Sequence, residues 1–266
     1  MSWLEAEGLR VRLGDRTVLD NVSLSVAKGE LVGLLGPNAS GKSTLLRTLA
    51  GLETSEAGAV RIDGATVASY APRDRARRIA YLEQGAASEW PIAVARLVAL
   101  GRTPHLEPWE RAGETDRDAI ADAMARCDVT HLASRAATEL SGGEAARVML
   151  ARALATGAGC LLADEPVSHL DPYHQFSIMG VIRAHADRGG LALAALHDLT
   201  LAARFCDRVL LLRNGKIAAA GPPGEILTPE ILARVFSVEA SLVEQDGLLQ
   251  VVQRGIVGGS HEEETP

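Results

Sequence analysis

The sequence has no long apolar run, and this shortage argues against a membrane-spanning helix. A span needs roughly 18–20 apolar residues. The best candidate, at 148–163, is interrupted by Arg152, Gly157 and Gly159. The first ten residues include acidic side chains and no apolar segment, so we expect no secretory signal.

Cysteine is scarce, and positive charge falls short of negative charge. Cys127, Cys160 and Cys206 are far apart, which argues against a zinc site or a disulfide framework and fits a reducing cytosol. Lysine and arginine number 27 against 34 aspartates and glutamates, a net charge of −7. We therefore expect no nucleic acid among the partners of this chain.

Strand and helix patterns alternate along the chain, which is typical of a parallel α/β fold. We expect hairpin strands within 4–35, a buried strand at 31–35, a helix at 42–52, a hairpin at 58–67, a mostly helical stretch at 86–140, a helix at 141–155, buried strands at 160–163 and 191–196, and a hairpin at 208–220. Asn214-Gly215 suits a type I′ turn in the last hairpin. The polar, acidic tail at 258–266 is typical of disorder.

A glycine-rich loop between the strand at 31–35 and the following helix matches the phosphate-binding pattern GxxxxGK[ST]. Its residues are Gly36, Pro37, Asn38, Ala39, Ser40, Gly41, Lys42 and Ser43. Backbone N–H groups at a helix N-terminus bind phosphate, and a lysine adds a positive charge on the β- and γ-phosphates. The Ser43 hydroxyl is a suitable ligand for Mg²⁺. The loop therefore predicts nucleotide binding.

Two carboxylates end the apolar strand at 160–163, which we expect to run beside the phosphate-loop strand. Neighbouring strand residues point to opposite faces, so Asp164 and Glu165 should have different roles. Asp164 would hold Mg²⁺ through water, and Glu165 would orient and deprotonate the attacking water. His197 ends the next buried strand and is expected to contact the γ-phosphate.

A second glycine pair, in Leu140-Ser141-Gly142-Gly143-Glu144, stands where a helix is expected to begin. By itself the segment could be an ordinary capped helix start. As a second phosphate-facing turn, however, it has no use in a chain with one nucleotide. Two copies arranged head to tail would need it, because each could offer its turn to the nucleotide of the other.

Together these motifs resemble the ABC transporter ATPases over about residues 4–240. The resemblance implies a P-loop NTPase (RecA-like) core, an antiparallel β subdomain and an inserted α-helical subdomain at about 86–155, all within a domain spanning 1–257. It also implies a catalytic base at Glu165, a switch histidine at His197 and a glutamine, Gln84, that senses Mg²⁺.

The resemblance further implies a homodimer that sandwiches two ATP molecules, with ATP and Mg²⁺ as the bound groups. The metal would meet Ser43, Gln84 and Asp164. The nucleotide would meet the loop from Gly36 to Thr44, the residue Leu13, the signature residues Ser141, Gly142, Gly143 and Glu144, and Asp171 in the D-loop.

Three positions depart from the family pattern. Leu13 stands where an aromatic residue usually stacks on adenine, which predicts a weaker or purely apolar contact with the base. Ala39 replaces a usual glycine of the phosphate loop, and Ala146 replaces a usual glutamine of the signature helix. None of these changes removes a catalytic group, so we expect an active ATPase.

Finer similarity points to importers of iron chelates (siderophores), haem and cobalamin. It lies at 98–105, 171–175, 196–207 and 227–240. Such an ATPase would sit on the cytoplasmic face of the inner membrane, bound to two permease subunits and served by a periplasmic substrate-binding protein. Trp90 would then be either a permease contact or a core residue. The alternatives are a soluble ABC ATPase, as in iron–sulfur cluster assembly, and a P-loop kinase.

Overall fold

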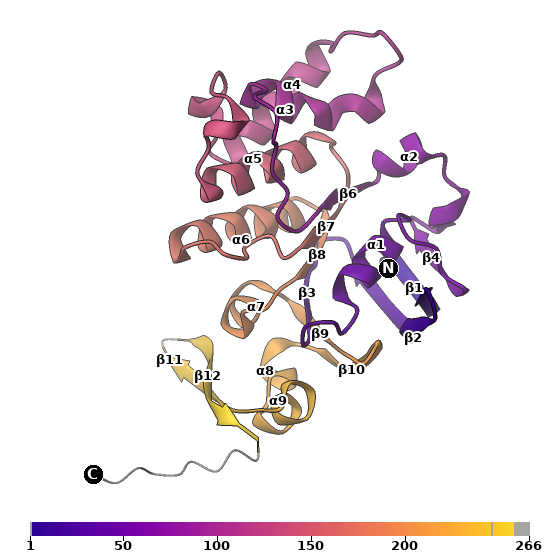
Figure 1. The fold of residues 1–266 in the computed structure, drawn as a ribbon, viewed down its shortest axis with the longest axis vertical. Helices are drawn as coiled ribbons and strands as arrows, with labels where there is room; N and C mark the ends of the chain where they lie inside the picture. The colour runs from indigo at the N-terminus through magenta and orange to yellow at the C-terminus, as the bar shows by residue number, and fades with distance from the viewer. Residues whose placement is uncertain (1, 246, 258–266) are drawn as a thin grey trace.

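The computed structural model describes residues 2–245 and 247–257, which form three sheets flanked by helices (Figure 1). The expected disordered tail at 258–266 lies outside the described residues. No helix in the described part of the chain is long and apolar enough to cross a membrane.

A six-stranded, mostly parallel sheet forms the centre of the molecule, in the order β10-β9-β3-β8-β7-β6. Its strands are β3 (Leu31–Leu35), β6 (Ile79–Leu82), β7 (Cys160–Asp164), β8 (Leu191–Ala195), β9 (Arg208–Arg213) and β10 (Lys216–Gly221). Only β10 runs antiparallel to its neighbour, because it closes a hairpin with β9. Asn214 and Gly215 both have positive φ, 49° and 72°, as the predicted turn requires.

One expectation about strand order is wrong. The strand that carries Asp164 is not the neighbour of the phosphate-loop strand, because β8 pairs with both β3 and β7 and lies between them. Spacing along a chain does not fix strand order in a doubly wound sheet. Three parallel strands, β3, β8 and β7, therefore end side by side.

An antiparallel sheet in the order β2-β1-β4-β5 lies beside the central sheet, on the right in Figure 1. It comprises β1 (Ser2–Leu13), β2 (Arg16–Ala27), β4 (Ala57–Ile62) and β5 (Ala65–Thr66). The hairpins predicted within 4–35 and at 58–67 are thus confirmed. A two-stranded sheet of β11 (Val238–Gln245) and β12 (Leu248–Ile256) follows the last helix, in yellow.

Nine α-helices lie among the described residues. They are α1 (Lys42–Leu49), α2 (Pro72–Ala76), α3 (Val94–Ala99), α4 (Glu114–Arg126), α5 (Gly142–Ala155), α6 (Pro172–Asp187), α7 (Leu199–Phe205), α8 (Pro223–Ile226) and α9 (Pro229–Phe236). Short 3₁₀ helices are η1 (Val67–Ser69), η2 (Leu100–His105), η3 (Thr130–Leu132) and η4 (Ala137–Glu139). The helix expected at 42–52 is shorter than predicted, because Gly51 turns the chain at φ 68°.

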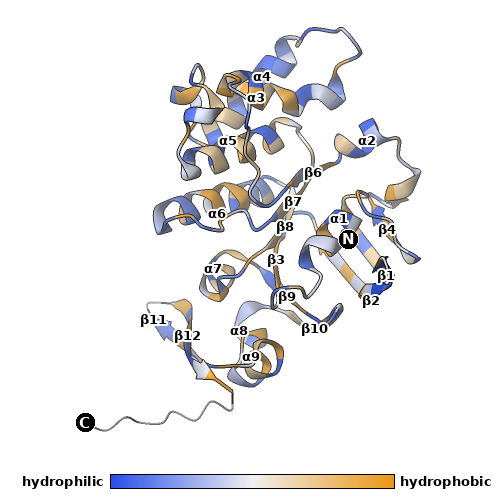
Figure 2. Ribbon diagram, viewed as in Figure 1, coloured by the Kyte–Doolittle hydropathy of each residue, from blue (hydrophilic) through white to orange (hydrophobic). Residues whose placement is uncertain are grey.

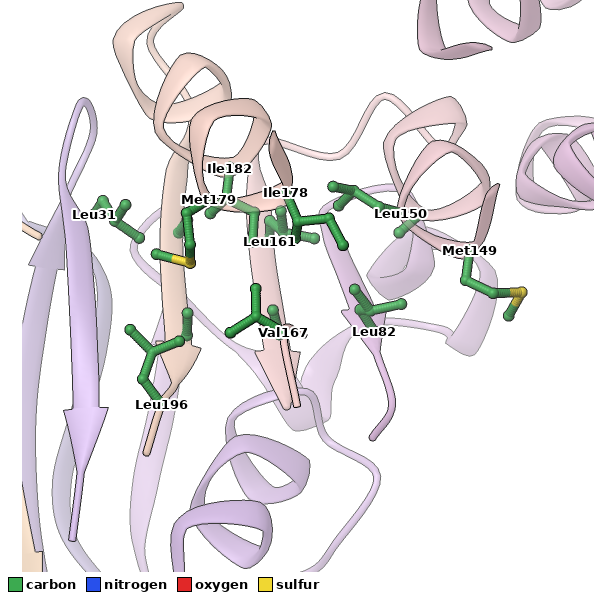
Figure 3. Close-up of a cluster of buried hydrophobic side chains, with 14 of the residues drawn as sticks. Leu31, Leu82, Met149, Leu150, Leu161, Val167, Ile178, Met179, Ile182 and Leu196 are labelled. Carbon is green, nitrogen blue, oxygen red and sulfur yellow. The ribbon is translucent and has the colours of Figure 1, made fainter. Parts of the chain in front are cut away.

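Both faces of the central sheet are buried, and this explains its continuous apolar strands. On β3, Leu31 and Leu35 belong to one core cluster, whereas Val32 and Leu34 belong to the other. The first cluster includes α5, α6 and α7, and Figure 3 shows Ile178 of α6 over the strands. The second joins α1 to the antiparallel sheet. Hydrophobic residues accordingly follow the sheet in Figure 2.

The helices α3, α4 and α5 gather at one end of the molecule, and η2 ties them together (Figure 1). Arg102 in η2 donates from Nη1 to the carbonyl oxygens of Ala155 and Thr156, at 2.9 and 3.2 Å. Its Nε donates to Asp116 Oδ1 at 2.8 Å. Nε2 of His105 lies 2.7 Å from the Thr156 oxygen. The importer-like stretch at 98–105 thus closes the C-terminal end of α5.

All three cysteines are free and buried. Burial raises the pKa of Cys127 and that of Cys206 to about 12, and it also raises the pKa of Cys160. These thiols therefore serve as apolar core residues in the described structure.

His185, in the last turn of α6, should make stability depend on pH. Burial lowers the pKa of its imidazole below the ordinary value of about 6.5, so the folded chain takes up this proton less readily than the unfolded chain. As pH falls below about 6.5 the unfolded chain takes up the proton first, and the free energy of unfolding decreases. We expect this effect to lower the free energy of unfolding by on the order of 1 kcal/mol between about pH 7.5 and about pH 5.5.

The measurement is urea unfolding at both pH values for the natural chain and for His185→Leu, which cannot titrate. The control is His131→Leu, a substitution at an exposed position of η3. Only His185→Leu should flatten the pH dependence, and equal slopes in all three proteins would contradict the argument.

Candidate nucleotide site

The phosphate loop joins the end of β3 to the start of α1 and depends on two glycines. Gly36 has φ 156°, and a Cβ there would overlap the Leu212 carbonyl oxygen and lie 2.9 Å from Ser40 Oγ. Gly41, with φ 106°, is the N-cap of α1. The turn between β9 and β10 supports the loop, because Gly215 N donates to Ser40 O at 3.1 Å.

Lys42 lies folded within this loop. Its Nζ donates to the carbonyl oxygens of Gly36 and Pro37, at 2.8 and 3.2 Å. Burial lowers the pKa of Lys42, while the nearby carboxylates of Glu165 and Asp164 act in the opposite direction. A buried ammonium group held only by carbonyl oxygens is well prepared to bind a phosphate.

A cavity of about 860 Å³ lies over the loop, large enough for a nucleotide. Its lining includes the loop residues Asn38 to Thr44, Gln84, Glu165 and His197, and from the antiparallel sheet Leu13, Arg16 and Val18. Leu13, the predicted adenine contact, therefore lies at the cavity and is 45% exposed. Arg16 makes no ion pair among the described residues.

Three predicted catalytic residues meet at Glu165. Gln84 Nε2 donates to Glu165 Oε2 at 2.6 Å, and His197 Nε2 lies 2.5 Å from Oε1. A carboxylate only accepts, so the His197 nitrogen carries the proton in this contact. Gln84 follows β6, Glu165 follows β7 and His197 follows β8, so the sheet itself brings the three side chains together.

The two neighbouring carboxylates occupy different environments, but strand alternation is not the cause. β7 ends at Asp164, and Glu165 leaves the strand in a left-handed conformation with φ 49°. Such a backbone is strained for a residue other than glycine, and this kind of strain is concentrated at functional sites. Asp164 is 3% exposed and remains on the strand beneath the loop.

Asp164 is a suitable partner for a hydrated cation. The Tyr81 hydroxyl donates to its Oδ2 at 3.3 Å, whereas its buried Oδ1 has no hydrogen-bond partner among the described residues. Burial raises the pKa of Asp164, and the Ser43 and Tyr81 hydroxyls partly offset that effect. An unpaired buried carboxylate oxygen beside a serine hydroxyl fits Mg²⁺, which prefers oxygen ligands and retains several waters.

The signature turn begins α5 with a capping box. Ser141 Oγ accepts from Glu144 N at 3.3 Å, and Glu144 Oε2 accepts from Ser141 N at 2.7 Å. The backbone hydrogen bond lowers the pKa of Glu144. Neither these residues nor Gly142 and Gly143 line the cavity over the phosphate loop. Within one chain, the two predicted phosphate-facing turns are therefore not brought together.

The D-loop, residues 168–171, lies a short distance after Glu165 and leads into α6. Ser168 donates to Glu165 O from its backbone nitrogen and its hydroxyl, at 3.2 and 3.1 Å. Asp171 caps α6 by accepting from His174 N at 3.0 Å, and it does not line the cavity. Its predicted contact with nucleotide stays a prediction.

Ser168 and His169 of the expected D-loop also line the cavity, whereas five further lining residues were not among the expected site residues: Arg16, Val18, Val167, Gln175 and Asp198. Gln175 could have been found from its position one helical turn after Asp171. Arg16 had no such signal, because a hairpin register sets its place.

The chain is similar in sequence to a known protein family. A family model described as "ABC transporter" matches residues 19–168. "Hemin import ATP-binding protein HmuV" from Pseudomonas entomophila (strain L48) is 43% identical over 241 residues, which cover 89% of this chain and 93% of that relative.

Two solved structures extend the similarity. A metal-chelate type ABC transporter in an inward-facing conformation matches with a TM-score of 0.83 at 23% identity, over 96% of this chain and 98% of that one. At this identity the match establishes the fold. A dimeric, post-hydrolysis ATP-binding cassette bound to ADP and Pi matches with a TM-score of 0.72 at 25% identity, over 83% and 98%.

Ala39 provides a test of strain in the phosphate loop. Its φ is 60°, a left-handed conformation that costs an L-residue roughly 1–2 kcal/mol. Ala39→Gly should therefore raise the free energy of unfolding by about 1 kcal/mol, after the entropy of the unfolded glycine is subtracted. Chemical unfolding without nucleotide measures this change.

The matched control is Ala71→Gly, at an exposed alanine with φ −57°. There glycine relieves no strain and should only destabilise the chain. Equal destabilisation by both substitutions would show that Ala39 is not strained.

Proposed function

The chain belongs to the ABC transporter ATPase family, and on that premise we propose that it is the ATP-hydrolysing subunit of a haem importer. The observation that carries the enzymatic part is Glu165, held between Gln84 and His197 beside the phosphate loop. The name of the 43% identical relative supports haem as the cargo.

ATP binds with its phosphates against the loop and its base toward the antiparallel sheet. Lys42 exchanges its carbonyl partners for the β- and γ-phosphates, which neutralise its buried charge. Leu13 and Val18 offer apolar contact to adenine, and the planar guanidinium of Arg16 can stack on the base. This arrangement replaces the aromatic residue that usually stands at position 13 in the family.

Hydrolysis follows from the position of Glu165. Its carboxylate accepts a proton from the attacking water as the water oxygen bonds to the γ-phosphorus and the bond to the bridging oxygen of ADP breaks. Gln84 and His197 orient the carboxylate, and His197 then contacts the γ-phosphate. Ser43, Gln84 and, through water, Asp164 would hold Mg²⁺, which would supply positive charge beside the transferred phosphoryl group.

Two copies assemble around two ATP molecules. The signature turn presents N–H groups at the start of α5, yet it lies outside the cavity of its own chain. A second copy in head-to-tail orientation brings Ser141 and Gly142 to the γ-phosphate. The dimeric ATP-binding cassette among the structural matches supports this arrangement.

A second groove fits a permease. It has a volume of about 720 Å³ and is bounded by α2, the loop after β6, η2 and α5. Leu52 and Leu100 line it, with 51% and 47% of their surfaces exposed. Trp90 follows the same loop and is 78% exposed, so the core-packing interpretation of this residue is wrong. The groove and Trp90 would receive a cytoplasmic segment of the permease, which holds the ATPase at the inner membrane.

Haem is favoured over siderophores and cobalamin only by the relative's name, because an ATPase subunit does not contact the cargo. A periplasmic binding protein would deliver haem to the permease. The alternative is a soluble ABC ATPase in a role such as iron–sulfur cluster assembly, and the exposed groove disfavours it.

Glu165→Gln tests the catalytic assignment. The amide retains the shape of the side chain but cannot take the proton, so hydrolysis should fall by on the order of 10²–10⁴-fold while ATP still binds. Phosphate release and light scattering with ATP measure turnover and dimer formation. Glu239→Gln, at an exposed position of β11, is the control and should behave as the natural chain. Undiminished turnover in Glu165→Gln would remove Glu165 from the role of base.

Two experiments test the partner and the cargo. Tagged Glu165→Gln protein should be recovered with ATP from detergent-solubilised native membranes, together with a polytopic permease. Reconstituted with the permease and binding protein, the natural chain should hydrolyse ATP faster with haem than with a ferric siderophore or cobalamin. Stimulation by another cargo would overturn the haem assignment, and recovery only from the soluble fraction would overturn the transport function.

A further inference from the structure

The two glycines of the signature turn have different surroundings. A Cβ at Gly142 would meet nothing within 4 Å, so this glycine is open to an approaching phosphate. A Cβ at Gly143 would overlap the imidazole of His174, at 2.5 Å from Cγ and closer to Cδ2 and Nε2. The His174 ring, which belongs to another helix, therefore leaves no room for a side chain at position 143.

His174 lies in the first turn of α6, which Asp171 caps. Its backbone nitrogen donates to Asp171 Oδ1 at 3.0 Å, and its Nε2 lies 3.9 Å from Asp171 Oδ2. Tyr173 packs edge-on at 5.2 Å between ring centroids. The side chain is 19% exposed, and its Nδ1 is buried without a hydrogen-bond partner among the described residues. An unpaired buried nitrogen of this kind calls for an explanation, and the ring's contact with Gly143 offers one.

This ring connects two parts of the site that otherwise belong to separate segments. On one side, α6 continues from the D-loop, which hydrogen-bonds to Glu165 through Ser168. On the other side, α5 begins with the signature turn at Gly143. The His174 ring therefore places the helix that follows the D-loop in direct contact with the signature turn.

We propose that His174 is a positioning residue that holds the signature turn in register with the D-loop of its own chain. The proposal rests on the ATP-sandwiched dimer of the proposed function, in which this turn serves the nucleotide of the other copy. His174 touches no substrate. It sets where Ser141 and Gly142 stand when the dimer closes, so its loss should affect closure and turnover rather than ATP binding by one chain.

The test is a double-mutant cycle between Gly143→Ala and His174→Ala, made in the natural chain for turnover and in Glu165→Gln for the ATP-dependent dimer. The added methyl group should push the turn away from the ring. Misplacement by about 1 Å can lower turnover by on the order of 10²-fold. Removing the ring in the double variant makes room for the methyl group and should restore at least about tenfold of that loss.

Gly142→Ala is the matched control. It adds the same methyl group to the neighbouring glycine, where no ring stands, so His174→Ala should not rescue it. His174→Ala alone should reduce kcat several-fold with an unchanged Kd for ATP in the monomer. Thermal unfolding of each variant identifies general loss of fold.

Each outcome has one meaning. Rescue of Gly143→Ala but not of Gly142→Ala, at constant ATP affinity, establishes the positioning role. Absence of rescue while the Glu165→Gln parent still dimerises with ATP overturns the inference alone, and Gly143 is then needed only for phosphate approach. Failure of the parent to dimerise with ATP overturns the sandwich and the inference together.

Discussion

The hydrogen bonds that Glu165 accepts from Gln84 and His197 depend on a single constraint, the parallel ends of β6, β7 and β8. Each side chain follows a different strand, so only correct strand order and register bring them within 2.6 Å of one carboxylate. The sheet is buried on both faces, which makes a slip of register costly. The packing of the core and the geometry of the site therefore depend on the same strand order and register.

Two buried ionisable groups of opposite sign lie at that edge of the sheet. Burial disfavours the charged forms of both Lys42 and Asp164, and it shifts their pKa values in opposite directions. Neither group has a direct ionic partner within 4 Å among the described residues. The site thus holds one buried group that would pair with an anion and one that would pair with a cation, and a nucleotide with its cation would supply both partners. Binding is favoured because it relieves a cost that folding has already incurred.

The sequence was sufficient to predict the elements that are specified locally. The apolar run before Gly36, the turn at Asn214 and the cap at Ser141 each have a short-range signal, and each was predicted correctly. Strand order was not predictable in this way, because β8 comes after β7 in the sequence but lies between β7 and the much earlier β3 in the sheet. The contact between His174 and Gly143 also escaped, since it depends on how two helices approach one another. The left-handed conformation of Glu165 escaped for a similar reason, as tertiary structure imposes it.

The burial of every cysteine has a practical consequence. A thiol reacts as the thiolate, and Cys127 and Cys206 have pKa values of about 12. Burial also protects Cys160 from both ionisation and access. The three native thiols of the chain should therefore react little with maleimides or thiol-directed spin labels. One engineered surface cysteine would carry a probe by itself, and distances between two copies could be followed through a turnover cycle without replacing any native residue.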